Sequence, residues 1–402
     1  MEDLFSEKYE AEFGEKIGIE IEYQLLDEAT LDLTDQVDLL LSEIGEDESV
    51  GPEVFQSCIE IKTPPVFNTG EAYRYFHEKL QTINYHAGAL GIRLCSLGVH
   101  PFNQKISKTT NRERYLALEK EYPYITHNQL NFATHVHISM DSLEQTLSVM
   151  NGMRPLIPLF MAVSASCPFW KGEETGFASF RQYLLKHNFN GGIPPHLETP
   201  EQFRNYCRAA LNAKAIHSLK DIHWDIKPRP DLGTLEVRMM DALPSLEEAM
   251  AISALAHCTV RALKRISLEK LIPDVFWSFL PRWAEEVNYF QAIHFGIDAS
   301  FIISQEGKTL PLREMVNTLV SAIKPFALEV NELEDINNLE RMLEEGLPYQ
   351  KLTKLYFETG SLKEVVNSTT VDSQEFFSDI PLVGLSLLPS RDQDLTFRPN
   401  RP

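Results

Sequence analysis

The stretch NFATHVHISM, residues 131–140, decides the fold that we predict for this chain. Its β-branched and polar side chains alternate, in the order Thr134, His135, Val136, His137, Ile138 and Ser139. Because successive side chains of a strand point to opposite faces, this alternation predicts a strand with both imidazoles on one face. Such a face suits a metal or phosphate site, but it also suits an ordinary half-exposed strand, and the histidine pair alone does not decide between them.

The composition is that of a globular protein with an acidic surface. The 402 residues are 43% hydrophobic and 24% charged, and 37 basic against 58 acidic residues give a net charge of -21. This charge argues against non-specific binding to nucleic acid or to anionic membranes. A protein of this charge that handles anionic substrates needs local cations, either Arg and Lys side chains or bound metal.

The cysteines and the N-terminus favour a cytoplasmic location. The five cysteines include no CxxC pair, so we expect reduced and mostly buried thiols. The first residues, MEDLFSEKYEAEFGEK, lack the apolar core of a signal peptide. The most apolar region, residues 156–170, is interrupted by Pro158 and Pro168 and is too short to span a bilayer.

Two further segments resemble strands with acidic faces. Residues 16–26, KIGIEIEYQLL, alternate so that Glu20 and Glu22 lie opposite a row of isoleucines. This is either a solvated outer face or a site where a cation relieves the repulsion between the two carboxylates. Residues 57–63 form the second strand, in which Glu60 is flanked by apolar residues, and Glu53 lies in or near the preceding turn. An unpaired buried carboxylate is costly, so a buried Glu60 requires a partner.

Cationic residues occur in the middle of the chain. Residues 234–240 form a predicted strand in which Glu236 and Arg238 face the same way, and Lys227 and Arg229 precede it in a loop. Residues 166–185 resemble an aromatic-anchored loop with Arg181 as its anion-binding group. The same loop is a candidate cover for a site, although an ordinary surface loop would have this composition too.

Helical periodicity accounts for much of the remainder. Ser245 and Glu248 form a capping box that predicts the start of one helix. Predicted helices cover residues 37–44, 71–90, 111–121, 142–165 with proline breaks, 201–213, 245–266, 274–293, 312–329, 333–346, 348–358 and 361–367. No linker or repeat marks a domain boundary, so we expect a single catalytic unit over 1–402. We divide it into a sheet-bearing core, 16–266, a helical portion packed on it, 267–370, and an irregular tail, 371–402.

If the predicted strands join one antiparallel sheet, their polar side chains share a face. That face combines four carboxylates and two imidazoles with an arginine at its edge, from Glu20, Glu22, Glu60, His135, His137, Glu236 and Arg238. Oxygen ligands with few histidines suit Mg²⁺ or Mn²⁺ better than zinc. Several such ions beside Arg and Lys would hold a nucleoside triphosphate, and the sequence contains no GxxxxGK[ST] phosphate loop.

Five motifs occur in an order that resembles a known family. They are GIEIEY, FQSCIEIKTPP, THVHIS, SCPFWKGEETGFASFR and HWDIKPRPDLGTLEVRMMDA, within residues 16–266. Together they resemble the type 2 glutamate-cysteine ligases, also called carboxylate-amine ligases, of the glutamine synthetase superfamily. The resemblance implies an α+β fold with a funnel-like antiparallel sheet backed by helices. It also implies phosphorylation of a carboxylate, commonly the γ-carboxylate of glutamate, by ATP, after which an amine such as cysteine attacks the acyl phosphate.

The resemblance also implies a role for each matching residue. Glu20, Glu22, Glu53, Glu60, His135 and Glu236 match metal-ligand positions, and His137 and Arg238 match phosphate contacts. Arg181, Lys227 and Arg229 match positions for the carboxylate substrate or the transferred phosphoryl group. The implied cofactors are ATP and Mg²⁺ or Mn²⁺. The expected partners are small molecules, without nucleic acid or membrane, and a homo-oligomer is compatible with the sequence.

The chain departs from the family pattern at four positions. Lys227 stands where we expect arginine, His223 where tyrosine is common, and Phe177 and Phe180 where tyrosines are usual. These changes alter hydrogen bonding near the substrate and leave the acceptor amine open. Two other hypotheses remain, a metal-dependent hydrolase that uses His135 and His137, and a nucleotide- or metal-binding regulator without catalysis.

Overall fold

The computed structural model describes residues 8–9, 15–128, 130–186, 190–273 and 280–371. One sheet of eight strands runs through it, with the path β10, β11, β5, β1, β3, β2, while β4 pairs with both β1 and β14. All of its pairings are antiparallel. The strands are β1 (Ile17–Asp27), β2 (Val50–Pro52), β3 (Cys58–Lys62), β4 (Ile92–Cys95), β5 (Ala133–Ser139), β10 (Ile226–Arg229), β11 (Thr234–Asp241) and β14 (Thr370–Val371).

The long strand β1 organises the sheet. Its first half pairs with β5 and its second half with β4, while β3 lies along its other edge. Ile17, Ile19 and Ile21 on one face are buried in the main hydrophobic core. Since side chains alternate along a strand, Glu20 and Glu22 lie on the opposite face.

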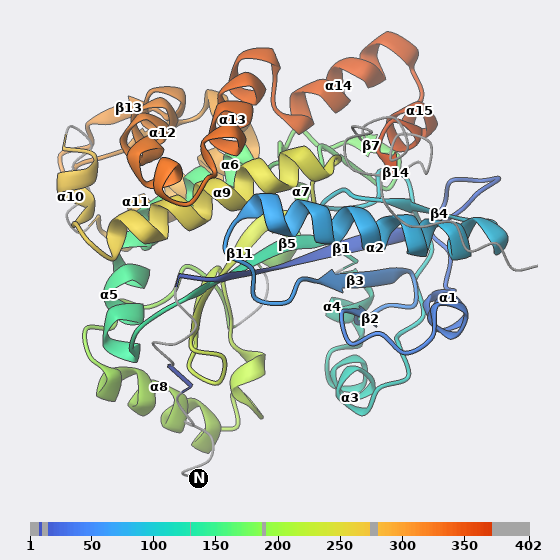
Figure 1. Cartoon of the computed structure of the whole chain (residues 1–402), viewed down its shortest axis with the longest axis horizontal. Coiled ribbons are helices and arrows are strands. Elements are labelled where there is room, and N and C mark those ends of the chain that lie inside the picture. The colour runs from blue at the N-terminus through green and yellow to red at the C-terminus, as the bar shows by residue number, and fades with distance from the viewer. Residues whose placement is uncertain (1–7, 10–14, 129, 187–189, 274–279, 372–402) are drawn as a thin grey trace, which may run out of the picture.

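Two long helices cover the apolar face of the sheet. They are α2 (Thr69–Ala89) and α9 (Leu246–Leu263), and Figure 1 shows both lying across the sheet, with the C-terminal helices stacked beyond α9. The α9 helix begins at Ser245, whose hydroxyl accepts a hydrogen bond from Glu248 N at 3.2 Å. This cap confirms the predicted start of the helix.

The remaining elements surround this layered core. The predicted helix over 142–165 is broken at its prolines into α5 (Leu143–Met153), a 3-10 turn η3 (Arg154–Leu156) and α6 (Ile157–Val163). The other helices are α1 (Val37–Ile44), α3 (Glu113–Glu121), α4 (Pro123–Asn128), α7 (Phe180–Leu185), α8 (Pro200–Asn212), α10 (Leu268–Leu271), α11 (Arg282–Phe295), α12 (Leu312–Glu329), α13 (Leu333–Glu345), α14 (Pro348–Thr359) and α15 (Leu362–Asn367), with 3-10 turns η4 (Leu219–Asp221) and η5 (Gly296–Asp298). Three small two-stranded sheets join β6 (Phe169–Trp170) to β7 (Glu173–Glu174), β8 (Gly191–Gly192) to β9 (His223–Trp224), and β12 (Ser300–Ile302) to β13 (Thr309–Pro311).

The predicted fold class, an antiparallel sheet backed by helices with a helical C-terminal third, is confirmed. The segment 166–185, which we predicted as a loop, instead forms the β6–β7 hairpin followed by α7. Of the helix predicted over 274–293, residues 274–279 lie outside the described part of the chain, as do residues 372–402 of the predicted tail. In that described part, no helix combines the length and the apolar character needed to cross a membrane.

We propose that the described chain is one structural unit, as expected. The main hydrophobic core draws its members from both the sheet-bearing part and the helical part of the chain, between Ile17 and Leu347. Near the end of the described chain, Thr370 and Val371 pair with Cys95 and Leu94 of β4 and add a strand to the central sheet. The helical portion therefore packs on the sheet layer and also returns to it.

Candidate active site

The strand register brings the predicted polar residues onto one face of the sheet. Glu22 lies opposite Glu60 in the β1–β3 pair, and Glu20 lies opposite His135 in the β1–β5 pair. On the far side of β5, His137 lies opposite Glu236 of β11. Four neighbouring strands thus contribute to one polar surface, as the alternation of their sequences predicted. Within it, two groups of side chains could each hold a metal ion.

The first group consists of Glu20, His137 and Glu236, whose ligand atoms all lie within 4.8 Å of one another. His137 Nε2 lies 3.6 Å from Glu20 Oε1 and 3.7 Å from Glu236 Oε1. This nitrogen is buried and has no hydrogen-bond partner, while the Nδ1 atom of the same ring lies 3.1 Å from Thr234 Oγ1. A buried ring nitrogen between two carboxylates, oriented through its other nitrogen, is arranged as a metal ligand.

The second group consists of Glu22, Glu53 and Glu60, again with ligand atoms within 4.8 Å. Glu53 lies in the loop before β3, where its carboxylate accepts hydrogen bonds from Tyr115 Oη at 3.3 Å and from Val54 N at 3.2 Å. Glu22 Oε2 accepts a hydrogen bond from Ala133 N at 2.8 Å. These contacts hold the carboxylates of a loop and two strands close together.

The second group is electrostatically unfavourable without a cation. Burial, followed by the negative charge of Glu53, raises the pKa of Glu22 to about 8. Burial likewise raises the pKa of Glu53, and it raises that of Glu60 well above its ordinary value. Since like charges at this distance cannot all ionise, a divalent cation is the natural way to keep these groups ionised at neutral pH. The three oxygen donors fit Mg²⁺ or Mn²⁺.

The first group differs because its carboxylates lie among cationic and polar partners. Burial alone would raise the pKa of Glu20, but hydrogen bonds and charge from His135 and His137 lower it below its ordinary value. Burial opposes ionisation of Glu236 too, and the Arg238 guanidinium lowers its pKa. Both carboxylates are therefore ionised at neutral pH and available as ligands.

The two histidines share Glu20 as a neighbour. His135 Nδ1 lies 3.6 Å from Glu20 Oε2, and burial lowers the pKa of His135 to about 4, so its ring is neutral at pH 7. The prediction made His135 a metal ligand and His137 a phosphate contact. The structure instead groups His137 with Glu20 and Glu236, while His135 lines the adjacent cavity. The division of roles stays a prediction, and the geometry makes both rings available to a metal.

Lys62 is a site residue that the sequence reasoning missed. It lies opposite Glu20 in the β1–β3 pair, contacts Glu60, and places its Nζ 4.0 Å from Glu20 Oε1. Its position two residues after Glu60 on a strand would have shown that it shares the face of that glutamate. A protein cation therefore lies between the two carboxylate groups.

The predicted phosphate-binding cations gather around Glu236. Arg238 contacts Glu236 directly, and Arg229 Nη1 lies 3.3 Å from Glu236 Oε2. Lys227 lies opposite Glu236 in the β10–β11 pair and is buried, and this burial lowers its pKa to about 7. The structure thus brings the three basic residues together, although Lys227 and Arg229 lie on strand β10 and not in a loop as predicted.

Arg181 lies on a helix and not in the loop that was predicted. It is on α7, is only 3% exposed, and donates a hydrogen bond from Nε to Asn131 Oδ1 at 3.1 Å. Its guanidinium also bonds the carbonyl oxygens of Met239 and Arg238 and lies 3.6 Å from Asp241 Oδ1. These carbonyls belong to the register shift of β11, so Arg181 supports the strand segment that carries Arg238.

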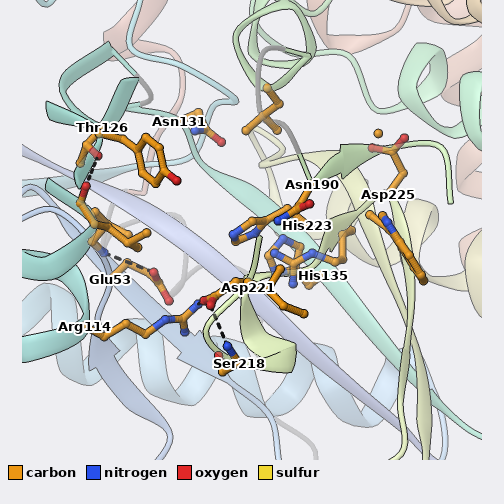
Figure 2. A pocket seen from close by; sticks show the side chains of 18 of the residues that line it. Glu53, Arg114, Thr126, Asn131, His135, Asn190, Ser218, Asp221, His223 and Asp225 are labelled. Carbon is orange, nitrogen blue, oxygen red and sulfur yellow. Dashed lines mark hydrogen bonds and ion pairs between the residues drawn. The ribbon is translucent and has the colours of Figure 1, made fainter. Parts of the chain in front are cut away.

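A cavity of about 470 Å³ adjoins the second acidic group, since Glu22 and Glu53 belong to its lining. Figure 2 shows its wall, with Glu53 and Arg114 on one side and His135, His223 and Asp225 on the other. Arg114 lies 3.3 Å from Asp221, and burial lowers the pKa of His223 to about 3, so His223 is neutral at pH 7. Its lining also includes Glu22, Arg181, Arg238, Trp224, Met239 and Tyr289. The cavity combines acidic, cationic and aromatic surfaces, as a site for a small polar molecule requires.

Two of the family departures lie away from this cavity. The rings of Phe177 and Phe180 pack against each other and against Tyr183, with centroids 5.1–5.9 Å apart. Neither phenylalanine lines the cavity, so the expectation that they alter hydrogen bonding near a substrate there is not supported. The β6–β7 hairpin does not line it either, and its role as a cover stays a prediction.

The comparisons of this sequence with known proteins agree on one family. The family model for glutamate-cysteine ligase family 2 matches residues 16–368. A relative from Trichormus variabilis named "Putative glutamate--cysteine ligase 2" is 33% identical over 352 residues, covering 88% of this chain and 91% of the relative. A similarly named protein of Mycolicibacterium smegmatis is 29% identical over 355 residues and covers 88% of this chain and 93% of its own length.

Solved structures agree on the fold. A glutamate-cysteine ligase of Francisella tularensis, solved in complex with AMP, has a TM-score of 0.64 at 13% identity, covering 92% of this chain and 90% of its own. A bifunctional glutathione synthetase of Pasteurella multocida has a TM-score of 0.63 at 12% identity, and the match covers 90% of this chain and 52% of the synthetase. At these identities the likeness extends to the fold alone.

Proposed function

The chain belongs to glutamate-cysteine ligase family 2, and on that premise we propose that it is an ATP-dependent ligase that joins the γ-carboxylate of glutamate to an amine through an acyl phosphate. The observation that carries the proposal is the pair of acidic groups, Glu20 with His137 and Glu236, and Glu22 with Glu53 and Glu60, on one face of the sheet. The AMP bound to the Francisella tularensis ligase supports a nucleotide as the second substrate.

The donor sets fit the metal ions that this reaction needs. Glu22, Glu53 and Glu60 offer three carboxylates whose pKa values are raised chiefly by burial, so that a bound divalent cation would favour their ionised forms. His137 Nε2 is an orphaned buried acceptor between two further carboxylates. Mg²⁺ or Mn²⁺ held there would neutralise the triphosphate and polarise the transferring phosphoryl group.

Residues of the chain supply the rest of the electrostatics. Arg238 and Arg229 place two guanidinium groups beside Glu236, where they would stabilise negative charge that develops on phosphate oxygens. Lys227, though its burial lowers its pKa to about 7, adds a partial positive charge at neutral pH. Arg181 acts as a positioning residue in this scheme, since it fixes the backbone of Arg238 and Met239.

The adjoining cavity is the proposed place for the amino-acid substrate. Its enclosure between β11, α7 and α3 would keep water from the acyl phosphate, which water would otherwise hydrolyse. Cysteine is one acceptor amine to be tested, together with other amino acids and amines. The five cysteines of the chain are free and buried, which supports work in the reducing cytoplasm.

The direct test is product analysis with the full-length chain. Purified protein is incubated with ATP, glutamate, Mg²⁺ or Mn²⁺ and a pool of amino acids and amines, and ADP release and product masses are measured. The proposal expects ADP release that requires both glutamate and an amine, with a product whose mass equals the sum of the two minus water. Glu236→Gln serves as the matched inactive control, because it removes one ligand charge and keeps the side-chain shape.

Two outcomes would favour the rival hypotheses. Turnover of a substrate without ATP would support a metal-dependent hydrolase. ATP binding by calorimetry, with no ADP release across the amine pool, would support a regulator without catalysis. Either result would overturn the ligase assignment.

A further inference from the structure

Asp225 lines the cavity, and the reaction proposed above gives it no role. It is the single residue between β9 and β10, and Figure 2 shows it in the wall of the cavity. Trp224, the residue before it, also belongs to the lining. Its backbone is fixed on both sides, since Asp225 N donates to Gly192 O at 2.9 Å and Arg238 N donates to Asp225 O at 2.8 Å. The carboxylate is thus held rigidly beside the strand segment that carries Arg238.

In the part of the chain that the structure describes, one carboxylate oxygen of Asp225 is buried without a hydrogen-bond partner. Only 7% of the residue is exposed, and Oδ2 is buried and accepts no hydrogen bond. Burial raises the pKa of Asp225 to about 7, against the pull of Lys186, Arg181 and Arg238 nearby. Leaving a buried acceptor unsatisfied is destabilising, and more so for a charged group, so this arrangement calls for an explanation.

The cations near Asp225 each face another group. Arg181 lies 3.6 Å from Asp241 Oδ1, and Arg238 contacts Glu236. Lys186 places its Nζ 4.1 Å from the ring centroid of Tyr289. No direct ion pair joins Asp225 to any of these three cations, so a cationic group of a molecule that enters the cavity could pair with its carboxylate.

The surroundings of Asp225 select the kind of cation. A metal ion needs several donor atoms, but in the described part of the chain Asp225 belongs to neither group of three potential ligands. The ring of Trp224 lines the same cavity and suits an organic ammonium, which both a carboxylate and an aromatic face stabilise. The fixed position of Asp225 also makes it a preorganised receptor for such a group.

We propose that Asp225 binds the ammonium group of the amino acid whose carboxylate is activated, and so makes the site specific for an α-amino acid over its deaminated analogue. This inference rests on the proposed ligase function. An ion pair with a carboxylate stabilises the protonated form of an amine, and a protonated amine cannot attack an acyl phosphate. The ammonium held by Asp225 therefore belongs to the amino acid whose carboxylate is phosphorylated. In this arrangement that carboxylate would lie toward Arg238 and the metal ions that the acidic groups would hold.

The test compares glutamate with glutarate, which differs from it by the amino group. Calorimetry measures the binding of each to the full-length chain with Mg²⁺ and a non-hydrolysable ATP analogue. We expect the wild type to bind glutamate at least about tenfold more tightly than glutarate, and Asp225→Asn to lose that preference because its affinity for glutamate falls. Asp298→Asn, the same change at an exposed position on η5, should keep the wild-type preference.

Each outcome is decisive for the assignment. An unchanged glutamate preference in Asp225→Asn, or no preference in the wild type, would overturn it. A selective rise in the KM of the amine, with the glutamate preference intact, would overturn it as well and assign Asp225 to the acceptor. Binding of the ATP analogue verifies that Asp225→Asn is folded. If Asp225→Asn is not folded, the test uses the glutamate preference of the wild type and of Asp225→Ser instead. Because binding is measured without turnover, failure of the ligase proposal appears separately, as a wild type that binds glutamate but releases no ADP.

Discussion

Lys62 Nζ lies 4.0 Å from Glu20 Oε1 across the β1–β3 pair. Since Lys62 also contacts Glu60, one ammonium group touches a member of each acidic group. Its charge competes with any divalent ion for the same carboxylates. Removing the charge should therefore strengthen metal binding, provided that the acidic groups are the metal sites.

Lys62→Met should bind Mn²⁺ about fivefold more tightly than the wild type. The side chain of Lys62 is 43% exposed, so we take the lower end of Coulomb interactions at 4 Å, about 1 kcal/mol. Titration of free Mn²⁺ by electron paramagnetic resonance gives the affinity. Lys79→Met removes a lysine of α2 whose partner, Asp47, belongs to neither acidic group, and it should leave the Mn²⁺ affinity unchanged. Equal or weaker binding by Lys62→Met would mean that the ammonium does not share the space of the metal.

Glu236→Gln should lose metal-dependent turnover by at least about 100-fold and stay folded. Glu236 is 1% exposed and contacts two guanidinium groups, and the amide keeps the shape of the side chain but not its charge. Changes to the outer partners of a metal site already cost about 10–100-fold, so the loss of a ligand should cost no less. ADP release and Mn²⁺ affinity are measured together. Glu286→Gln, at an exposed position on α11, is the control, and near-wild-type turnover in Glu236→Gln would remove this residue from the site.

The sequence predicted those parts of the site that follow from strand alternation. Glu20, Glu22, Glu60 and His137 lie on a common face because side chains two apart on a strand must do so, and the sheet register then joins the strands. Glu53 is different, because it comes from a loop and its place beside Glu22 was implied only by the family resemblance.

Properties that depend on distant neighbours could not be predicted. Arg181 was predicted to bind an anion, and nothing near it in the sequence indicates that Asp241 and the β11 carbonyls would occupy its guanidinium. The missing partner of Asp225 is likewise a property of the folded cavity. Phe177 and Phe180 belong to an aromatic cluster and not to the cavity lining, and only the folded structure shows this.

His100 should make the fold sensitive to acid. Its ring is 1% exposed, Nδ1 accepts a hydrogen bond from Asn103 N at 2.9 Å, and Nε2 lies 2.9 Å from Leu31 O. Burial lowers its pKa from 6.5 to about 4, so between these values the unfolded chain binds the extra proton. Stability from this residue is thus complete above pH 6.5 and is lost as the pH falls to about 4, by about 3 kcal/mol at ~1.4 kcal/mol per pH unit.

Urea unfolding between pH 4 and 7 measures this dependence. His100→Gln should be less stable than the wild type at pH 7, because its burial and hydrogen bonds are optimised for an imidazole, but its stability should fall less between pH 6.5 and pH 4. His86→Gln, at a half-buried position on α2, should follow the wild-type curve. Parallel curves for the wild type and His100→Gln would show that another group accounts for the acid sensitivity.

Glu332 should anchor the helical third to the sheet layer. It is fully buried at the start of α13, where its carboxylate accepts a hydrogen bond from Thr69 N at 2.9 Å and lies 2.9 Å from His257 Nδ1. Thr69 opens α2 and His257 lies within α9, so one carboxylate ties together three helices that are far apart in the sequence. Glu332→Ala removes the shared acceptor and leaves the buried groups unpaired, which should cost about 3–5 kcal/mol.

Urea unfolding of the full chain, followed by circular dichroism, tests this anchor. Glu332→Gln should cost less than Glu332→Ala, since the amide oxygen can still accept from Thr69 N. Glu334→Ala, an exposed change in the same first turn of α13, should shift the midpoint little. If Glu332→Ala were as stable as Glu334→Ala, the Glu332 carboxylate would not anchor the helical third, and other contacts, such as the hydrogen bond from Thr69 Oγ1 to Asp335 Oδ2, would suffice.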